Sequence, residues 1–489
     1  MSPSVERFNE AKYKALMDGL ECSEISFMNA MASSYSSRLD SVFFKKDAIE
    51  FSLISKEWDV LSAICPKVKS GTTPTIRDED LKEGVALLKT NDIRNNILNP
   101  LSTEQFFYID EQTNKKMKST LVKGKDVLIN IVGASTDVIG RVSFVPDEFI
   151  TANITQAMAI LRIENNNYLP EYLFAFLLSN YAKRQTDRIA RQTGQYNMNL
   201  KEVGTYRIWK PSMDFQLQIA KIINIANTYQ IKAKKLYQDG QDIASRLFSI
   251  SKDVYNQNIS IRSMNSSYKV SARLDAEYYQ TKYQMYENAV FTTNKGYTYV
   301  KDKFKHIKTK CSRELDTYNY IEIGDVDVGT GTASFNAIKT KELPDNAKIM
   351  TIKGDVLVST VRPNRGAIAI LENDNLLVSG AFTVLRQKDD YPKEVLQTLF
   401  RTSIYKDWLL RFNVGTSYPV IKDDDVLNMP IPVYEKNIED EIVSNVRNAY
   451  HLRNQSKQLI DFAKRAVEIS IEQDEEKAIE WLKEKGVEC

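Results

Sequence analysis

The stretch Ser37-Arg38-Leu39-Asp40-Ser-Val-Phe43-Phe44 returns 235 residues later as Ala272-Arg273-Leu274-Asp275-Ala-Glu-Tyr278-Tyr279. Two further segments also return in the same order. Val122-Lys-Gly-Lys-Asp-Val-Leu-Ile129 matches Ile352-Lys-Gly-Asp-Val-Leu-Val358, and Thr193-Gly-Gln-Tyr196 matches Val414-Gly-Thr-Ser417. Ordered matches over about 180 residues indicate an internal duplication. The chain is therefore two diverged copies of one unit, which we place at residues 36–213 and 268–434.

Each copy combines short strands with helices. The strand-like runs are separated by turn residues: Val85–Leu88, Val127–Val132 and Met158–Ile163 in the first copy, and Asn319–Ile323, Asp355–Ser359 and Phe382–Arg386 in the second. A helix follows, over Pro170–Tyr181 and Pro392–Phe400, and proline favours the first helical turn. The pattern predicts an α+β fold with mixed strands and helices.

Each copy ends in a long run of apolar residues at helical spacing, over 214–248 and 438–471. Each run is about 35 residues, or about 50 Å at 1.5 Å per residue. We expect the two helices to pack as an antiparallel coiled-coil spacer that relates the copies by a pseudo-twofold; the alternative is that each lies on its own copy. The expected division is 1–35 as an N-terminal extension, 214–255 and 435–475 as the spacer helices, and 476–489 as a tail, expected to be a solvated helix.

Composition excludes several classes of protein. The chain has 489 residues, a net charge of +2, four scattered cysteines and two histidines, His306 and His451. This inventory argues against a disulfide framework and against a zinc site. No phosphate-binding loop, hydrolase elbow or Pro-Pro element of an amino-methyltransferase is present. We predict no catalytic residue, no metal and no cofactor on this chain; a nuclease with an unrecognised carboxylate site is the remaining catalytic alternative. With no apolar membrane span or signal core, we expect a cytoplasmic protein.

Basic residues gather in each copy although the net charge is small. Residues 181–210 hold seven basic side chains against two acidic ones, and residues 295–313 hold seven against one. Neutralising phosphates requires local positive potential, so these stretches suit DNA; an ordinary solvated face is the alternative. The segment 191–197 adds Arg, Gln, Gln and Asn around a glycine, and 362–366 is a similar turn. These side chains pair with base edges in the major groove.

The doubled motifs resemble the target-recognition domains of type I restriction–modification specificity subunits. The resemblance includes the Arg-Leu-Asp element, Ser70-Gly-Thr-Thr-Pro74, Leu88–Ile93 and Gly133…Gly140-Arg141, and covers roughly residues 36–470. The second copy departs from it, with Lys310-Cys-Ser-Arg313 near the place of the Ser-Gly-Thr-Thr-Pro segment. The candidate DNA-contacting residues are Lys69, Thr72, Thr73, Asn91, Arg94, Arg191, Gln192, Gln195, Tyr196, Asn197, Lys308, Lys310, Arg362, Asn364, Arg365, Asn413, Thr416, Ser417 and Tyr418.

The resemblance implies a non-catalytic subunit that selects a bipartite double-stranded DNA site, one half per copy, with the two helices setting the spacing. It implies two adenine-N6 methyltransferase subunits as partners, which would carry S-adenosylmethionine, and, where the system has one, an endonuclease/translocase subunit. Alternatives are a specificity partner of a methylase–nuclease outside type I and a structural scaffold that does not read DNA.

Overall fold

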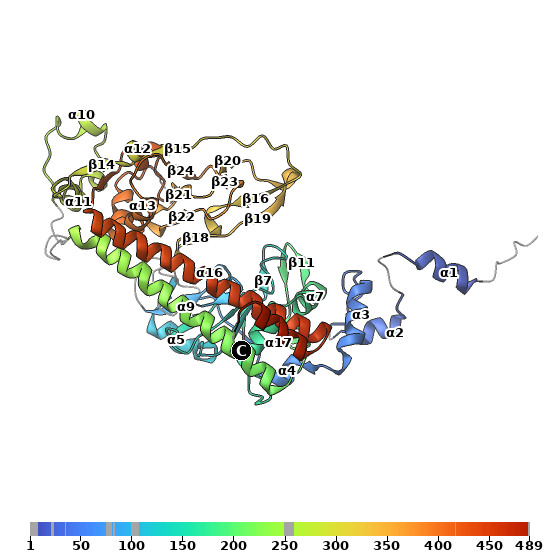
Figure 1. The fold of residues 1–489 in the computed structure, drawn as a ribbon. Coiled ribbons are helices and arrows are strands. Elements are labelled where there is room, and N and C mark those ends of the chain that lie inside the picture. Colours follow the sequence, from blue (N-terminus) through green and yellow to red (C-terminus); the bar gives the residue numbers. More distant parts are fainter. Residues whose placement is uncertain are drawn as a thin grey trace, which may run out of the picture. The chain divides into compact units, whose positions relative to one another are not determined.

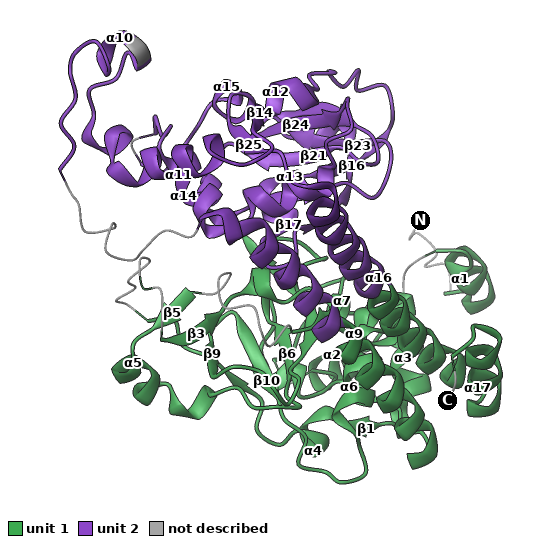
Figure 2. Ribbon diagram, turned by 60° about the vertical axis from the view of Figure 1, so that its left-hand side comes forward, with its two compact units in different colours: residues 1–229, 455–489 green, residues 230–454 purple. Residues whose placement is uncertain are grey.

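The computed structural model describes residues 8–20, 24–34, 36–74, 81, 84–98, 107–248, 259–415 and 417–487 (Figure 1). These residues form two compact units, coloured separately in Figure 2. Unit 1 comprises 1–229 with 455–489, and unit 2 comprises 230–454. Each unit thus contains one copy of the repeat together with part of both long helices, and each is described by itself.

Unit 1 holds the first copy and both ends of the described chain. Its helices are α1 (Glu10–Met17), α2 (Phe27–Ala32), α3 (Lys46–Ile54), α4 (Leu61–Ile64), α5 (Glu111–Lys116), α6 (Pro170–Leu178), α7 (Asn180–Ile189), α8 (Leu200–Val203) and α17 (Glu475–Glu484). Its strands are β1 (Asp59–Val60), β2 (Lys69–Ser70), β3 (Val85–Leu88), β4 (Asn96–Ile97), β5 (Phe107–Ile109), β6 (Val127–Asn130), β7 (Val132–Gly133), β8 (Val142–Phe144), β9 (Ala152–Ile154), β10 (Met158–Leu161), β11 (Arg191–Thr193), β12 (Gln195–Asn197) and β13 (Arg207–Ile208).

Unit 2 holds the second copy. Its helices are α10 (Tyr268–Ser271), α11 (Thr281–Phe291), α12 (Val300–Lys303), α13 (Lys393–Phe400), α14 (Ser403–Leu410) and α15 (Asp423–Leu427). Its strands are β14 (Tyr297–Tyr299), β15 (Phe304–His306), β16 (Thr317–Ile321), β17 (Val326–Asp327), β18 (Thr332–Ala333), β19 (Asn336–Lys339), β20 (Ala347–Thr351), β21 (Val356–Ser359), β22 (Ile368–Ile370), β23 (Leu376–Ser379), β24 (Phe382–Gln387) and β25 (Pro430–Pro432).

The duplication seen in the sequence is present in the sheets. The order β2-β10-β6-β8 in unit 1 is repeated as β15-β24-β21-β22 in unit 2. A second sheet is repeated as well, because β5-β3-β9 and β19-β16-β23 share one antiparallel and one parallel pairing. The expected α+β fold with two repeated domains is therefore confirmed.

A buried acid–base pair explains the repeated Gly-x-Asp-Val-Leu and Gly-Asp-Val-Leu segments. Asp126 is 1% exposed and accepts two hydrogen bonds of 2.7 Å from Arg162, which directly follows β10, the strand paired with β6. Asp355 is fully buried and accepts equivalent bonds of 2.7 and 2.8 Å from Arg386. Breaking such a pair leaves a buried charge uncompensated, so each copy keeps both partners.

The two long helices are α9 (Met213–Ser245) and α16 (Lys436–Glu472). In unit 1, Ile222 and Ala226 of α9 share a core with Ile460 and Ala463 of α16. In unit 2, Ala233 and Tyr237 share a core with Val446 and Ala449. Because numbers rise along α9 while they fall along α16, the helices run antiparallel, as expected (Figure 1). The helix α9 ends at Ser245 and a 3₁₀ turn covers Arg246–Phe248, before the expected limit at 255; residues 249–258 lie outside the described ranges.

The C-terminal tail is not the solvated helix that its acidic composition suggested. In α17, Ala478 and Leu482 are fully buried and belong to the unit 1 core. The Trp481 ring packs edge-on against Phe462 of α16 at 5.6 Å. The charged residues lie on the outer face of this short helix, which is why their number hid the two buried positions.

Candidate nucleic-acid interface

The segment 191–197 of the first copy forms a hairpin of β11 and β12. Thr193 pairs with Gln195 across Gly194, which has φ +91° and has no atom within 4 Å of the position that a Cβ would take. Glycine suits this turn because a positive φ strains other residues. Gln192 and Gln195 are exposed, so their amides are available to a ligand. The strand β12 then joins β7, where Tyr196 pairs with Gly133.

The base of this hairpin is held by an ion pair. The Arg191 guanidinium donates to Oε1 of Glu202 and to Oγ of Ser36. Glu202 is 3% exposed, so the pair is anchored in the core of unit 1. Arg191 was expected to contact DNA, and this stays a prediction; in the structure its guanidinium is engaged by Glu202 and Ser36.

The loop 134–141 lies beside this hairpin, because it follows β7, the neighbour of β12. Lys183 of α7 donates a hydrogen bond of 2.6 Å to the carbonyl of Thr136. Arg141 donates one of the same length to the carbonyl of Asp137. Thr136 and Asp137 are exposed. The sequence analysis did not include these two residues among the DNA-contacting candidates. Their position between the repeated strands β6 and β8 could have indicated an exposed loop there.

In the second copy, the turn 362–366 and the loop 413–418 form one surface. Arg362 has φ +50°, its N–H donates 2.7 Å to the carbonyl of Pro419, and its guanidinium lies 5.6 Å from the Tyr418 ring centre. Val361 and Val420 form an isolated β-bridge. The side chains of Arg362, Asn364, Arg365, Ser417 and Tyr418 are exposed. Sequence reasoning thus selected two segments that the fold brings together.

Two further predicted residues belong to this segment, Asn413 and Thr416. Asn413 uses its Oδ1 to accept from the N–H groups of Gly415, at 2.8 Å, and Val420, at 2.9 Å. Its amide therefore holds the loop closed, which is a structural contribution. Thr416 lies outside the described residues.

The predicted residues Lys69, Thr72, Thr73, Asn91 and Arg94 lie elsewhere in unit 1, and only Lys69 is in a strand. Lys69 is exposed on β2, and Thr72 is exposed just after it. Asn91 is exposed, and its carbonyl accepts 2.8 Å from Nε of Arg94. None of these residues lies in the sheet β11-β12-β7 that contains the hairpin.

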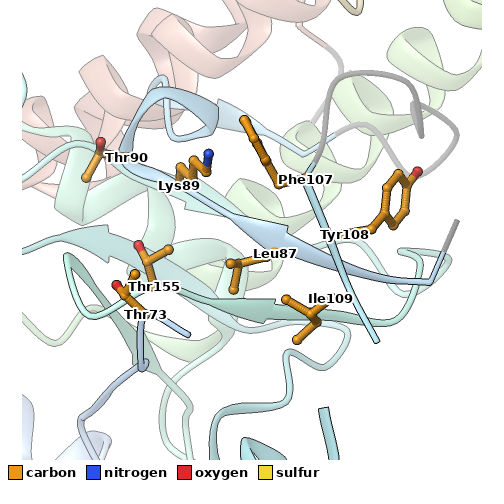
Figure 3. A pocket seen from close by; sticks show the side chains of 8 residues that line it. All are labelled: Thr73, Leu87, Lys89, Thr90, Phe107, Tyr108, Ile109 and Thr155. Carbon is orange, nitrogen blue, oxygen red and sulfur yellow. The ribbon is translucent and has the colours of Figure 1, made fainter. Parts of the chain in front are cut away.

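A glycine shapes the chain after β2. A Cβ on Gly71 would lie 1.8 Å from the carbonyl oxygen of Ile154, so only glycine permits this approach. Next to it, Thr73 lines a cavity of about 230 Å³ with Lys89, Phe107 and Thr155 (Figure 3). In unit 2, Lys308 and Lys310 are exposed just after β15, the counterpart of β2.

Several basic residues of the two stretches are engaged within the protein. Arg188 donates to the carbonyl of Phe43, and burial lowers the pKa of its guanidinium. Arg207 donates 3.0 Å to the carbonyl of Trp58. Lys303 forms ion pairs with Asp389 and Asp390. The net positive potential available to phosphates is therefore smaller than the residue counts suggested.

Within the described ranges, no group of three or more His, Cys, Asp or Glu side chains is placed to hold a metal ion. Among the same residues, no helix combines the length and apolar character needed to cross a membrane.

Comparison with known proteins identifies the first copy. Residues 56–238 match the family described as Type I restriction modification DNA specificity domain. The chain is also similar to the solved S subunit of the type I restriction–modification system from M. genitalium, at 12% identity over 84% of this chain and 94% of that chain, with a TM-score of 0.34. It is similar as well to the HsdS subunit from Thermoanaerobacter tengcongensis, at 14% identity over 86% of this chain and 97% of that chain, with a TM-score of 0.27. Residues 56–238, with the hairpin 191–197 among them, therefore match a type I restriction modification DNA specificity domain.

Proposed function

We propose that this chain reads a bipartite double-stranded DNA target, with one half-site bound by each copy. The observation that carries the proposal is the repeated placement of an exposed polar loop directly after the second helix of a helix pair. In unit 1 the hairpin follows α7, and in unit 2 the loop 413–418 follows α14. Since the sheets around them share one strand order, equivalent loops suit equivalent tasks on two half-sites.

The chemistry of the exposed side chains supports base reading. The exposed Gln192 and Gln195 can pair with adenine, and the exposed Arg362 and Arg365 can pair with guanine, in the major groove. Asn197 is half-buried, and its amide donates to the carbonyl of Gln195. Exposed lysines such as Lys69, Lys308 and Lys310 supply contacts to phosphates, which fix position without reading sequence. We assign Arg191 and Asn413 to support of the reading loops.

We further propose that α9 and α16 act as a ruler between the half-sites. The two helices have 33 and 37 residues, or about 50–55 Å at 1.5 Å per residue. One turn of DNA is roughly 34–36 Å, so helices of this length suit a target with an unread spacer. Each helix belongs to both units, so a change in its length affects both readers.

The proposed partners are two adenine-N6 methyltransferase subunits, which would carry S-adenosylmethionine and flip the target base. An endonuclease/translocase subunit joins where the system encodes one. Because the ligand is the cell's own DNA, we place the assembly in the cytoplasm.

The experiment is methylome sequencing of host DNA with the gene intact and deleted, followed by complementation. We expect adenine methylation at one split motif to disappear on deletion and to return with the intact chain. Unchanged methylation, in a host that expresses the methyltransferase partner, would refute bipartite reading and favour a scaffold. Metal-dependent DNA cleavage by the purified chain alone would favour the nuclease alternative.

A further inference from the structure

The repeated Arg-Leu-Asp segment of the first copy is attached to the start of the hairpin. Nε and Nη2 of Arg38 donate hydrogen bonds to the two carboxylate oxygens of Asp40, at 2.7 and 2.9 Å. Its remaining terminal nitrogen donates 2.7 Å to the carbonyl of Ile189, the last residue of α7. Arg191, which begins the hairpin, follows two residues later. One buried guanidinium therefore joins the entry of the copy to the root of its reading loop.

The second copy repeats this arrangement with different neighbours. Arg273 donates to both carboxylate oxygens of Asp275 at 2.7 Å and to the carbonyl of Asn413 at 2.9 Å. Asn413 begins the loop 413–418. In both copies the arginine also lowers the pKa of its aspartate partner, through hydrogen bonds to the carboxylate, so this carboxylate is ionised at neutral pH.

A second arginine completes each arrangement by enclosing an aromatic ring. The Phe43 ring centre lies 5.0 Å from the Arg38 guanidinium and 4.3 Å from that of Arg188. The Tyr278 ring centre lies 4.8 Å from Arg273 and 4.5 Å from Arg411. Arg411 donates 3.1 Å to the carbonyl of Tyr278, as Arg188 does to that of Phe43 at 3.2 Å. We call each set of two arginines, one aspartate and one aromatic ring a clasp.

The contacts of a clasp determine the position of the reading loop. The carbonyls at the end of a helix lack helical partners, and a cation there is favoured by the helix dipole. Arg38 provides that cation at α7 and fixes it with two bonds to Asp40, so the loop leaves the helix in one direction. Base reading requires side chains held within about 0.5 Å of the productive geometry. By contrast, Leu39 and Leu274 of the same segments are 59% and 67% exposed.

We propose that Arg38 and Arg273 are positioning residues that set the base preference of the first and the second copy, respectively. They act through the carbonyls of Ile189 and Asn413 and make no contact with DNA themselves. The inference rests on the proposed function, since it assigns one half-site to each copy.

The test measures base preference at each half-site separately. The full-length chain, assembled with its methyltransferase partner, is offered DNA libraries in which one half-site is randomised and the other is kept. For Arg38→Ala we expect roughly tenfold lower discrimination at the half-site of the first copy, the scale of one lost base contact, and no change at the other. Arg273→Ala should show the reverse.

Matched variants separate positioning from stability. Arg38→Lys keeps the charge but cannot bridge a carboxylate and a carbonyl with a planar fork, so it should behave like Arg38→Ala. Phe43→Leu keeps apolar bulk while removing the ring between the arginines, and covers the case in which Arg38→Ala does not fold. Leu39→Ala, in the same segment, should leave both preferences unchanged.

Equal loss at both half-sites in Arg38→Ala, Arg38→Lys and Phe43→Leu, together with a lower melting temperature, would overturn the inference in favour of a purely structural clasp. Unchanged preference in these folded variants would overturn it as well. If the wild-type complex shows no split preference at all, the proposed function fails first, and that outcome is distinct from either result.

Discussion

Arg191 donates to the carboxylate of Glu202, whose side chain is 3% exposed, and this pair closes the base of the hairpin β11–β12. The residue whose type best matched guanine recognition is thus engaged by the protein. The exposed glutamines beyond it are supported by that pair.

This relationship gives a test for Arg191. In Arg191→Ala a buried carboxylate loses its partner, which costs about 1–3 kcal/mol of unfolding free energy. In the double variant with Glu202→Gln the side chain is neutral, so we expect both the stability and the half-site preference to recover. Denaturant unfolding and library selection measure the two quantities. Recovered stability without recovered preference would show instead that Arg191 reads a base.

The exposed amide of Gln195 should read the first half-site. Gln195→Ala is expected to reduce discrimination at one base pair by about 1–3 kcal/mol. Stability should change by less than about 0.5 kcal/mol, because the side chain is exposed. Gln112→Ala, an exposed glutamine of α5, is the matched control. Loss of preference in both variants, or in neither, would contradict the assignment of the hairpin.

Arg365 should act on the second half-site. Arg365→Ala is expected to weaken binding to the preferred sequence by about 1–3 kcal/mol while leaving altered half-sites less affected. A residue that contacts only phosphate would weaken all sequences alike and reduce the salt dependence. Lys339→Ala, an exposed basic residue of β19, removes the same charge elsewhere. DNA-binding titrations at several salt concentrations distinguish a base contact from a phosphate contact.

The helix pair should set the spacer. Deleting four residues, about one turn, from α9 together with four facing residues from α16 keeps the antiparallel core in register. We expect the methylated motif to keep both half-sites and to change only its unread spacing. Altered half-site sequences at the old spacing would contradict the ruler.

The tail helix should stabilise the first copy. Leu482→Ala removes a fully buried side chain from the unit 1 core and should cost about 2–5 kcal/mol. Lys483→Ala, on the exposed side of α17, is the control and should be neutral. Hydrogen exchange should show the loss of amide protection within residues 1–229. Uniform loss in both units would mean that α17 stabilises the whole chain.

The sequence predicted the duplication and the long helices because both are visible in the spacing of residues along the chain. Arg38 and Arg273 could be matched by spacing alone, and apolar periodicity located α9 and α16. The tail was harder, because two buried positions in ten residues are hidden by seven acidic residues over 472–489.

The candidate site was predictable in its segments but not in its pairings. Residue types located the hairpin and the turn 362–366. The pairing of Arg191 with Glu202, and the inward use of Arg188 and Arg207, depend on contacts between residues distant in sequence. Charge counts therefore overestimated the basic surface.

The placement of residues 455–489 in unit 1 has a consequence for how the chain is made. Ile460, Val467 and Leu482 belong to the same core as residues of the first copy, yet they follow the second copy in the chain and are synthesised after it. The first copy cannot complete its core until the second copy has been synthesised. A chain cut before residue 455 would thus lack part of the core around its first copy, even though every residue of that copy would be present.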